Sequence, residues 1–313
     1  MQEDKSLALK SYTGPLLIVI AALLWAVDGV IRRYLYSLPP ITIIFFEHLF
    51  GLVILFPFVF KYIFKTNLTK REWMLLLLIS ILSGVLGTLW FTTALLKVNF
   101  ISFSVVFLLQ KLQPIFAISS ARIFLKEKID KRYIVWAVLA IIAAFFVTFK
   151  NGIVDLKTGQ GTIIAAIYAL GAAFAWGTST TFSKMLLGKV RSDVSTFYRF
   201  LFTILLAFPV LLLFGYGGSI GDVTLPQFGY FSLIAVSTGM VALLIYYKGL
   251  STTPVHVSTI LELTFPFVAI FIDMQLYNTS LSMSQWFAAF LLVFSIYKII
   301  RLRQEQEVEN LPV

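Results

Sequence analysis

The sequence contains no cysteine and unusually little charge. None of its 313 residues is Cys, which excludes disulfide bonds and thiolate chemistry. Charged residues make up 13% of the chain and hydrophobic residues 59%, against about 25% and roughly 45–50% in soluble domains. A mean hydropathy of +0.91 reflects the same excess. The composition therefore predicts a protein whose solvent is the lipid bilayer.

Motifs for enzymatic chemistry and for metal binding are also missing from the sequence. There is no phosphate-binding loop, and the glycines between Gly215 and Asp222 fit an outer connector instead. The two histidines, His48 and His256, lie far apart, and neither has a Cys or a cluster of carboxylates beside it. We therefore expect no catalytic residue, no metal and no cofactor, with a membrane-embedded enzyme as the weaker alternative.

Ten apolar segments are long enough to cross a bilayer. At about 1.5 Å per residue, about 20 residues span a hydrocarbon core of about 30 Å. The segments cover residues 15–35, 41–60, 73–95, 101–124, 132–149, 161–184, 194–215, 226–249, 254–276 and 283–301. The sequence thus predicts an all-α membrane protein with ten transmembrane helices.

The sequence shows an internal duplication of a five-helix unit. The stretch LISILSGVLG at 78–87 returns in altered form as LIAVSTGMVA at 233–242. A similar offset relates Trp25 to Trp176, His48 to Arg199, Pro114 to Pro266 and Trp136 to Trp286. Because five spans end on the opposite side from where they begin, the two copies are expected to be inverted repeats. We place the repeats at 15–149 and 161–303, with a connector at 150–160 and cytoplasmic tails at 1–14 and 304–313.

The distribution of Lys and Arg predicts the orientation. Eighteen of these cations fall on one side of the expected spans, and five fall on the other: Arg32, Arg33, Lys97, Lys150 and Lys157. Cytoplasmic loops retain positive residues, so both termini are predicted to be cytoplasmic in a multi-pass protein of the inner or plasma membrane. The formal charge of +10 then reflects insertion and attraction to anionic lipid headgroups, not nucleic-acid binding.

Several passages resemble a known family. They are ALLWA around Trp25, WFTTALLKVNFISFSVVFLLQKLQPIFA at 90–117, ARIFLKEKI at 121–129 and YYKGLSTTPVHVSTILELTFPFVAI at 246–270. With the duplication, they are similar to the drug/metabolite transporter superfamily, in its EamA branch, over nearly the whole chain. The resemblance implies a ten-helix secondary transporter and says little about its substrate. The family's Leu-Gly-Glu is matched by Leu125-Lys126-Glu127, which implies a cap or ion pair for Glu127 at the cytoplasmic edge.

Two charged residues are expected near the middle of the membrane, Lys111 and Glu262. A charge at this depth costs at least about 2.5–3.5 kcal/mol, so each requires a partner or a function. Both lie just before a proline, Pro114 or Pro266, that removes a helix hydrogen bond and loosens the preceding turn. They are either a structural ion pair between the repeats or a split site. In the split site Lys111 receives a substrate carboxylate, and Glu262 receives a cationic group or a coupling proton.

Further candidates for substrate contact are polar or aromatic side chains expected near these two charges. Ser258 and Gln113 extend the polar surface beside them, and Tyr246 adds to the aromatic one. For any single member, helix packing is the alternative explanation. The further candidates for substrate binding are Thr259, Gln110, Trp25, Trp90, Trp176 and Tyr247.

Three residues nearer the membrane faces are candidates for gating or proton coupling. Glu47 and His48 are expected in the outer part of the second helix and Arg199 in the inner part of the seventh, with helix-to-helix hydrogen bonding as the alternative. Because His48 and Arg199 are equivalent positions of inverted repeats, we expect them near opposite faces. Asp28 and Arg32 are expected to form a local pair one helical turn apart.

Together these features predict a secondary transporter, an exporter or exchanger working by alternating access. The expected substrate is a small polar metabolite, with an amino acid or related zwitterion favoured and S-adenosylmethionine or a nucleoside-like metabolite as the alternative. A receptor or assembly subunit that binds without transport is the second alternative. The expected partners are the substrate, the lipid bilayer and, as one option, a coupling proton. The sequence leaves monomer and homodimer both open.

Overall fold

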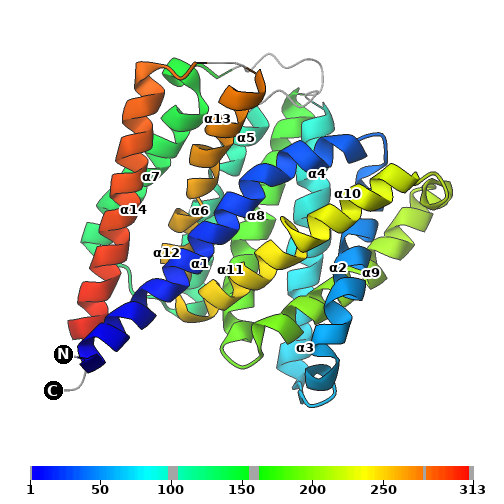
Figure 1. Cartoon of the computed structure of the whole chain (residues 1–313), viewed down its shortest axis with the longest axis horizontal. Helices are drawn as coiled ribbons and strands as arrows, with labels where there is room; N and C mark the ends of the chain where they lie inside the picture. Colours follow the sequence, from blue (N-terminus) through cyan, green and yellow to red (C-terminus); the bar gives the residue numbers. More distant parts are fainter. Residues whose placement is uncertain (1, 98–104, 155–161, 278–279, 310–313) are drawn as a thin grey trace.

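The structure, a computed structural model, describes residues 2–97, 105–154, 162–277 and 280–309. Within these ranges every regular element is a helix (Figure 1). Eight helical stretches of the described residues are long and apolar enough to cross a membrane. The all-α membrane architecture predicted from the sequence is therefore confirmed.

Six of the helices run without interruption. They are α1 (Gln2–Arg32), α2 (Pro40–Ile63), α7 (Lys131–Thr148), α8 (Thr162–Leu187), α9 (Ser192–Leu213) and α14 (Met283–Glu309). Large apolar side chains on their outer faces are mostly exposed, including Phe58, Leu213 and Phe290 at 73%, 85% and 70%. Exposed apolar surface on this scale is the surface expected to meet lipid.

Two of the expected spans, 73–95 and 226–249, are irregular in the middle. The first consists of α3 (Lys70–Ile79), the π-helical η2 (Ser80–Gly87) and α4 (Thr88–Lys97). The second is divided into α10 (Leu225–Val236) and α11 (Met240–Thr252). Both stretches are still long and apolar enough to cross a membrane, over Lys70–Lys97 and Leu225–Thr252, so the two expected spans are present. Their irregular turns coincide with the Ser-Gly and Ser-Thr-Gly sequences of the duplicated stretch.

Two further expected spans, 101–124 and 254–276, are broken at their prolines. Within 105–125 the chain forms α5 (Val105–Gln110), α6 (Gln113–Ser120) and the π-helical η3 (Ala121–Leu125). The later segment forms α12 (Val255–Leu261) and α13 (Thr264–Tyr277). Each break falls just before the proline, at 111–112 and 262–263. Both segments are thus divided in the turn that precedes the proline, where the missing proline N–H weakens the helix.

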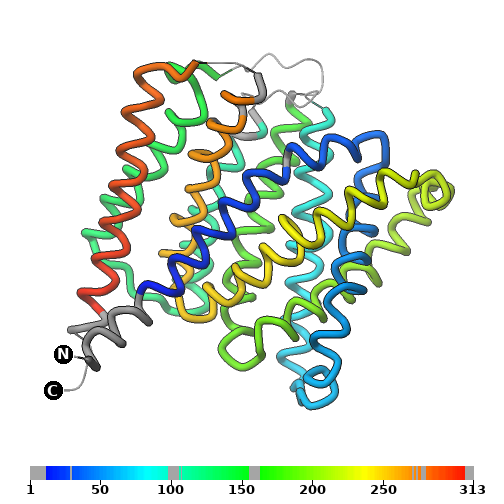
Figure 2. The backbone as a smooth tube through the Cα atoms, viewed as in Figure 1, coloured from blue at the N-terminus to red at the C-terminus, as the bar shows by residue number. Residues whose placement is uncertain are grey.

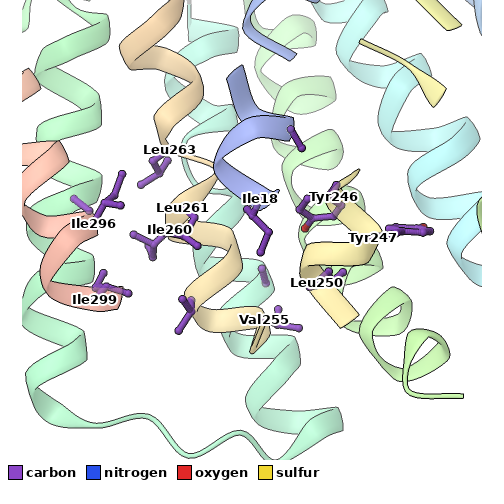
Figure 3. Close-up of a cluster of buried hydrophobic side chains, with 14 of the residues drawn as sticks. Ile18, Tyr246, Tyr247, Leu250, Val255, Ile260, Leu261, Leu263, Ile296 and Ile299 are labelled. Carbon is purple, nitrogen blue, oxygen red and sulfur yellow. The ribbon is translucent and has the colours of Figure 1, made fainter. Parts of the chain in front are cut away.

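Helices at equivalent places in the two halves pack against each other. The helices α7 and α14 lie side by side, as do α2 and α9 (Figure 1). The helix α1 runs along α11 (Figure 2). Around α12 the buried side chains of Ile260 and Leu261 lie between Ile296 on α14 and Ile18 on α1 (Figure 3). This arrangement buries α12 inside the bundle, where it also packs against α6.

Close packing between α8 and α6 depends on a residue without a side chain. A Cβ atom added at Gly177 would lie 2.7 Å from the Gln113 carbonyl oxygen and 3.0 Å from the Ala117 nitrogen. Both neighbours are backbone atoms, so neither can rotate away. Small residues at such contacts let membrane helices approach closely.

We predict that Gly177→Ala lowers the free energy of unfolding by about 1–3 kcal/mol, because the methyl group forces α6 away from α8. The matched control is Gly229→Ala in α10, where an added Cβ meets nothing within 4 Å and should stabilise the helix by about 0.5–1 kcal/mol. Thermal unfolding in detergent measures both. Equal shifts in the two variants would contradict the packing argument.

Candidate functional site

Glu262 connects the two broken helices at the level of their breaks. Its Oε1 accepts a hydrogen bond of 2.6 Å from the Tyr246 hydroxyl. Its Oε2 accepts one of 3.1 Å from Gln113 Nε2, and Gln110 Nε2 donates to Gln113 Oε1 at 3.4 Å. The Trp25 ring lies 5.1 Å from the ring of Tyr246. The structure thus joins α1, α5, α6, α11 and the α12–α13 break in one network, which we call the central network.

Lys111 lies at the other break but is not paired with Glu262. Its side chain is buried, and its Nζ lies 5.3 Å from the centre of the Phe265 ring. Among the described residues, no carboxylate lies within ion-pair distance of this ammonium group. The structural ion pair considered from the sequence is therefore not formed in this structure. Contact with an aromatic face is favourable for a desolvated cation.

A second network surrounds Arg199. Its guanidinium donates to the Tyr247 hydroxyl at 2.9 Å and to Ser83 Oγ at 2.6 Å. The Trp176 indole donates to the Ser83 carbonyl at 3.4 Å, and Ser183 lies 3.1 Å from the Tyr247 hydroxyl. We call this the Arg199 network. It holds the π-helical η2 against α8, α9 and α11, and π-helical turns are frequent at functional sites.

A third network lies at the division between α10 and α11. Asp28 accepts from Arg32 Nε at 2.7 Å, as the sequence predicts for this i,i+4 pair, and from the Thr238 hydroxyl at 2.6 Å. Arg32 Nη1 lies 2.7 Å from Glu47 Oε1, a close ion-pair contact. Two carboxylates thus share one guanidinium, and we call this group the Arg32 network.

His48 does not lie where the sequence places it relative to Arg199. Its Nδ1 is 2.8 Å from the Ile44 carbonyl oxygen, and its ring packs edge-on against Phe200 at 5.0 Å. Phe200 follows Arg199 directly in α9. The expectation that His48 and Arg199 lie near opposite faces is therefore wrong. Because α2 and α9 pack side by side, the two residues come close together instead.

The remaining candidates occupy separate positions. Trp90 packs against α8, where a Cβ at Gly171 would meet its ring at 2.9 Å. Thr259 is buried in α12, and its hydroxyl has no hydrogen-bond partner among the described residues. Among the described residues, neither Trp90 nor Thr259 forms a hydrogen bond with the central network. Ser258, weighed beside Thr259, is the one whose hydroxyl reaches Tyr246, at 3.5 Å.

Glu127 fastens the start of α12 at the end of the bundle where α14 also ends (Figure 1). Its carboxylate accepts hydrogen bonds from the backbone nitrogens of Val255 at 2.8 Å and His256 at 3.1 Å, and from His256 Nδ1. Tyr133 donates to the His256 carbonyl oxygen. Burial raises the pKa of Glu127, but the hydrogen bonds from His256 and Val255 outweigh it and hold the pKa below its ordinary value. The family-based expectation of a cap at this residue is met across the two halves of the chain.

Broken helices that meet inside an apolar bundle, with polar side chains at the breaks, are typical of secondary transporters. Comparison with known proteins agrees with this class. The sequence profile of the EamA-like transporter family matches the chain twice, at residues 12–149 and 163–301. The chain belongs to this family, and it is a multi-pass membrane transporter and not an enzyme.

Two relatives extend the comparison. The chain is 34% identical over 292 residues to a protein named riboflavin transporter ImpX from Fusobacterium nucleatum subsp. nucleatum, covering 92% of this chain and 98% of the relative. A solved structure, described only as a protein crystal structure, matches with a TM-score of 0.74 at 14% identity. That match covers 95% of this chain and 99% of the solved one, and it supports the fold alone.

We predict that Glu127→Gln lowers the free energy of unfolding by about 1–3 kcal/mol at neutral pH, because an amide group replaces an oxygen that accepts from N–H donors. A depressed carboxyl pKa stabilises the folded state above the unfolded pKa, about 4.3 for Glu, and this contribution is lost as the pH falls through the folded pKa. The difference in Tm between the wild type and Glu127→Gln should therefore be constant down to about pH 4.3 and shrink below that pH. Glu305→Gln, at an exposed carboxylate on α14, is the control. A difference independent of pH would refute the assignment.

We also predict that Lys111→Met and Glu262→Gln change stability independently, because the two side chains are not paired. Their combined effect on thermal stability should equal the sum of the single effects to within about 0.5 kcal/mol. In a structural ion pair, the double variant would instead recover much of the stability that each single variant loses. Such recovery would show that the ion pair exists in the protein.

Proposed function

We propose that this transporter carries riboflavin or a closely similar flavin, and that the central network is its binding site. The observation that supports the substrate is the similarity to a riboflavin transporter along nearly the full length of both chains. The side chains of the central network suit the same molecule. A flavin has a flat aromatic ring system, a hydrogen-bonding pyrimidine edge and a polyol chain.

The aromatic part of the network suits the flavin ring system. The Trp25 and Tyr246 rings lie 5.1 Å apart at an interplanar angle of 53°, so they touch without stacking on each other. Aromatic pairs prefer offset-stacked or edge-to-face contact, worth about 0.5–1.5 kcal/mol beyond the buried area. A ligand ring that stacks on Trp25 would gain such contact when the helices separate. Trp176 and Tyr247, in the Arg199 network, can provide aromatic surface for a second orientation during transport.

The polar part of the network suits the pyrimidine edge. A primary amide presents one acceptor and two donors, which matches an edge that alternates carbonyl oxygens with an N–H group. Gln110 and Gln113 supply two such amides beside Glu262. In the structure these groups bond one another. A flavin edge can therefore replace their mutual hydrogen bonds without leaving a buried polar atom unsatisfied.

A zwitterion is the second candidate substrate, and the separation of Lys111 from Glu262 favours it. Since the two charges do not neutralise each other, Lys111 can receive a carboxylate and Glu262 an ammonium group. An amino acid has this chemistry, and S-adenosylmethionine combines it with an aromatic base. A receptor with the same site would bind its ligand but would not move it across the membrane.

Alternating access would act through the broken helices. We infer ten spans in two inverted repeats, with α5–α6 and α12–α13 as the fourth and ninth, and both termini on the cytoplasmic side. Clustered cations at the end where α14 finishes support this orientation. Glu127 then closes the cytoplasmic side, and Glu47 in the Arg32 network is the candidate for a coupling proton. His48 and Arg199 would act together where α2 meets α9.

We predict that Trp25→Leu weakens riboflavin binding at least tenfold, or about 1.4 kcal/mol, because the stacking surface is lost. Trp25→Phe, which keeps an aromatic face, should stay within about threefold of the wild type. The matched control is Trp286→Leu, a tryptophan that is 50% exposed on α14. Quenching of flavin fluorescence by the purified protein measures binding.

Transport is tested separately, with the wild-type protein in proteoliposomes. Saturable riboflavin flux supports the proposal, while binding without flux would indicate a receptor. If riboflavin does not bind, but arginine or S-adenosylmethionine does and Lys111→Met weakens that binding, the substrate is a zwitterion and not a flavin. An equal loss of riboflavin affinity in Trp25→Leu and Trp286→Leu would contradict the assignment of the binding site to the central network.

A further inference from the structure

A hollow between α7 and α14 lies at the end of the bundle where α14 finishes, away from the three polar networks. Its volume is about 470 Å³. The side chains that line it come only from these two helices, and they combine cations with aromatic rings at the edge of the expected membrane. We propose that this groove binds one anionic phospholipid, with the headgroup phosphate at Lys298 and Arg301.

The two cations are held in place by aromatic neighbours and not by acids. Lys298 Nζ lies 5.8 Å from the centre of the Trp136 ring and 5.5 Å from that of Phe294. Arg301 donates from Nε to the Tyr297 hydroxyl at 2.9 Å. Among the described residues, neither cation has a carboxylate within ion-pair distance. The lining has three cations, Arg132, Lys298 and Arg301, and one carboxylate, Glu305, so the groove keeps a net positive charge.

Arg132 completes the rim of the groove from α7. Its guanidinium contacts Asp130 at 3.0 Å and Glu305 at 3.4 Å, so its charge is largely balanced. These contacts fix Arg132 at the edge and leave Lys298 and Arg301 as the anion-binding pair. Tyr and Trp are common at the level of lipid headgroups, and Tyr297 and Trp136 occupy that level here.

An apolar track leads from the groove along α14 into the membrane. Phe287, Phe290 and Phe294 are exposed at 69%, 70% and 38%, and their spacing places them on one side of the helix. From Lys298 to Phe287 the helix rises about 16 Å, about half of a hydrocarbon core of about 30 Å. The track therefore has the length of one acyl chain in one leaflet. A free phosphate ion would use the two cations but not this track.

The test is lipid binding to the detergent-purified protein, measured by native mass spectrometry with phosphatidylglycerol and phosphatidylcholine of equal chain length. The wild type should retain one phosphatidylglycerol in preference to phosphatidylcholine. The double variant Lys298→Gln with Arg301→Gln should weaken the retention of phosphatidylglycerol at least tenfold. The double variant Phe290→Ala with Phe294→Ala should weaken the retention of both lipids. The control is Lys61→Gln with Lys65→Gln, which removes the same charge from exposed positions at the end of α2.

Each outcome decides the proposal. Equal losses in the two charge variants would mean that general surface charge attracts the lipid, and the groove would be rejected. Equal retention of the two lipids would also reject it. Inorganic phosphate is added as a competitor. If it displaces bound phosphatidylglycerol as effectively as free phosphatidylglycerol does, the groove is a site for anions and not for a lipid, and the proposal is rejected. Unchanged thermal unfolding of the variants excludes misfolding as the cause, and Lys298→Arg should retain the lipid.

Discussion

The hydrogen bonds of Glu262 hold together the two places where the transmembrane backbone is interrupted. In hydrocarbon, an interrupted helix leaves polar backbone groups that must find partners within the protein. The breaks at 111–112 and 262–263 lie inside the bundle, and Gln113 and Tyr246 meet Glu262 between them. A buried carboxylate is tolerated there because both of its oxygens accept hydrogen bonds. In the proposed function riboflavin replaces these same bonds, so one group would serve both the stability of the bundle and ligand binding.

The other irregular segments repeat this arrangement in each half of the chain. Ser83 in η2 and Thr238 between α10 and α11 occupy equivalent positions of the duplicated stretch. Ser83 receives Arg199 from the second half, and Thr238 donates to Asp28 from the first. Each half thus fastens the irregular helix of the other with a charged side chain. Under the proposed alternating access, these crossed contacts would change as the halves move relative to each other.

Much of this organisation is predictable from the sequence, because membrane helices leave a strong signal in hydropathy and the duplication preserves its anchor residues. The helix breaks at Pro114 and Pro266 follow from the chemistry of proline. The irregular turns at Ser83 and Thr238 do not, because Ser and Gly are also tolerated in regular membrane helices. The partner of Glu262 is not predictable either. Its bond to Gln113 depends on how α6 and α12 pack, and charge alone favours Lys111. The position of His48 relative to Arg199 is not predictable for the same reason. The depth of a residue along its own helix does not determine which residue of the neighbouring helix it contacts.

The central claim is that the central network, at the paired helix breaks, is where the substrate binds. An experimental structure of the protein with riboflavin bound tests this most directly. The account predicts the flavin ring against Trp25 and Tyr246, with its pyrimidine edge at Gln113 and Glu262 and their mutual hydrogen bond broken. A flavin bound elsewhere, with the bond between Gln113 and Glu262 intact, would contradict it.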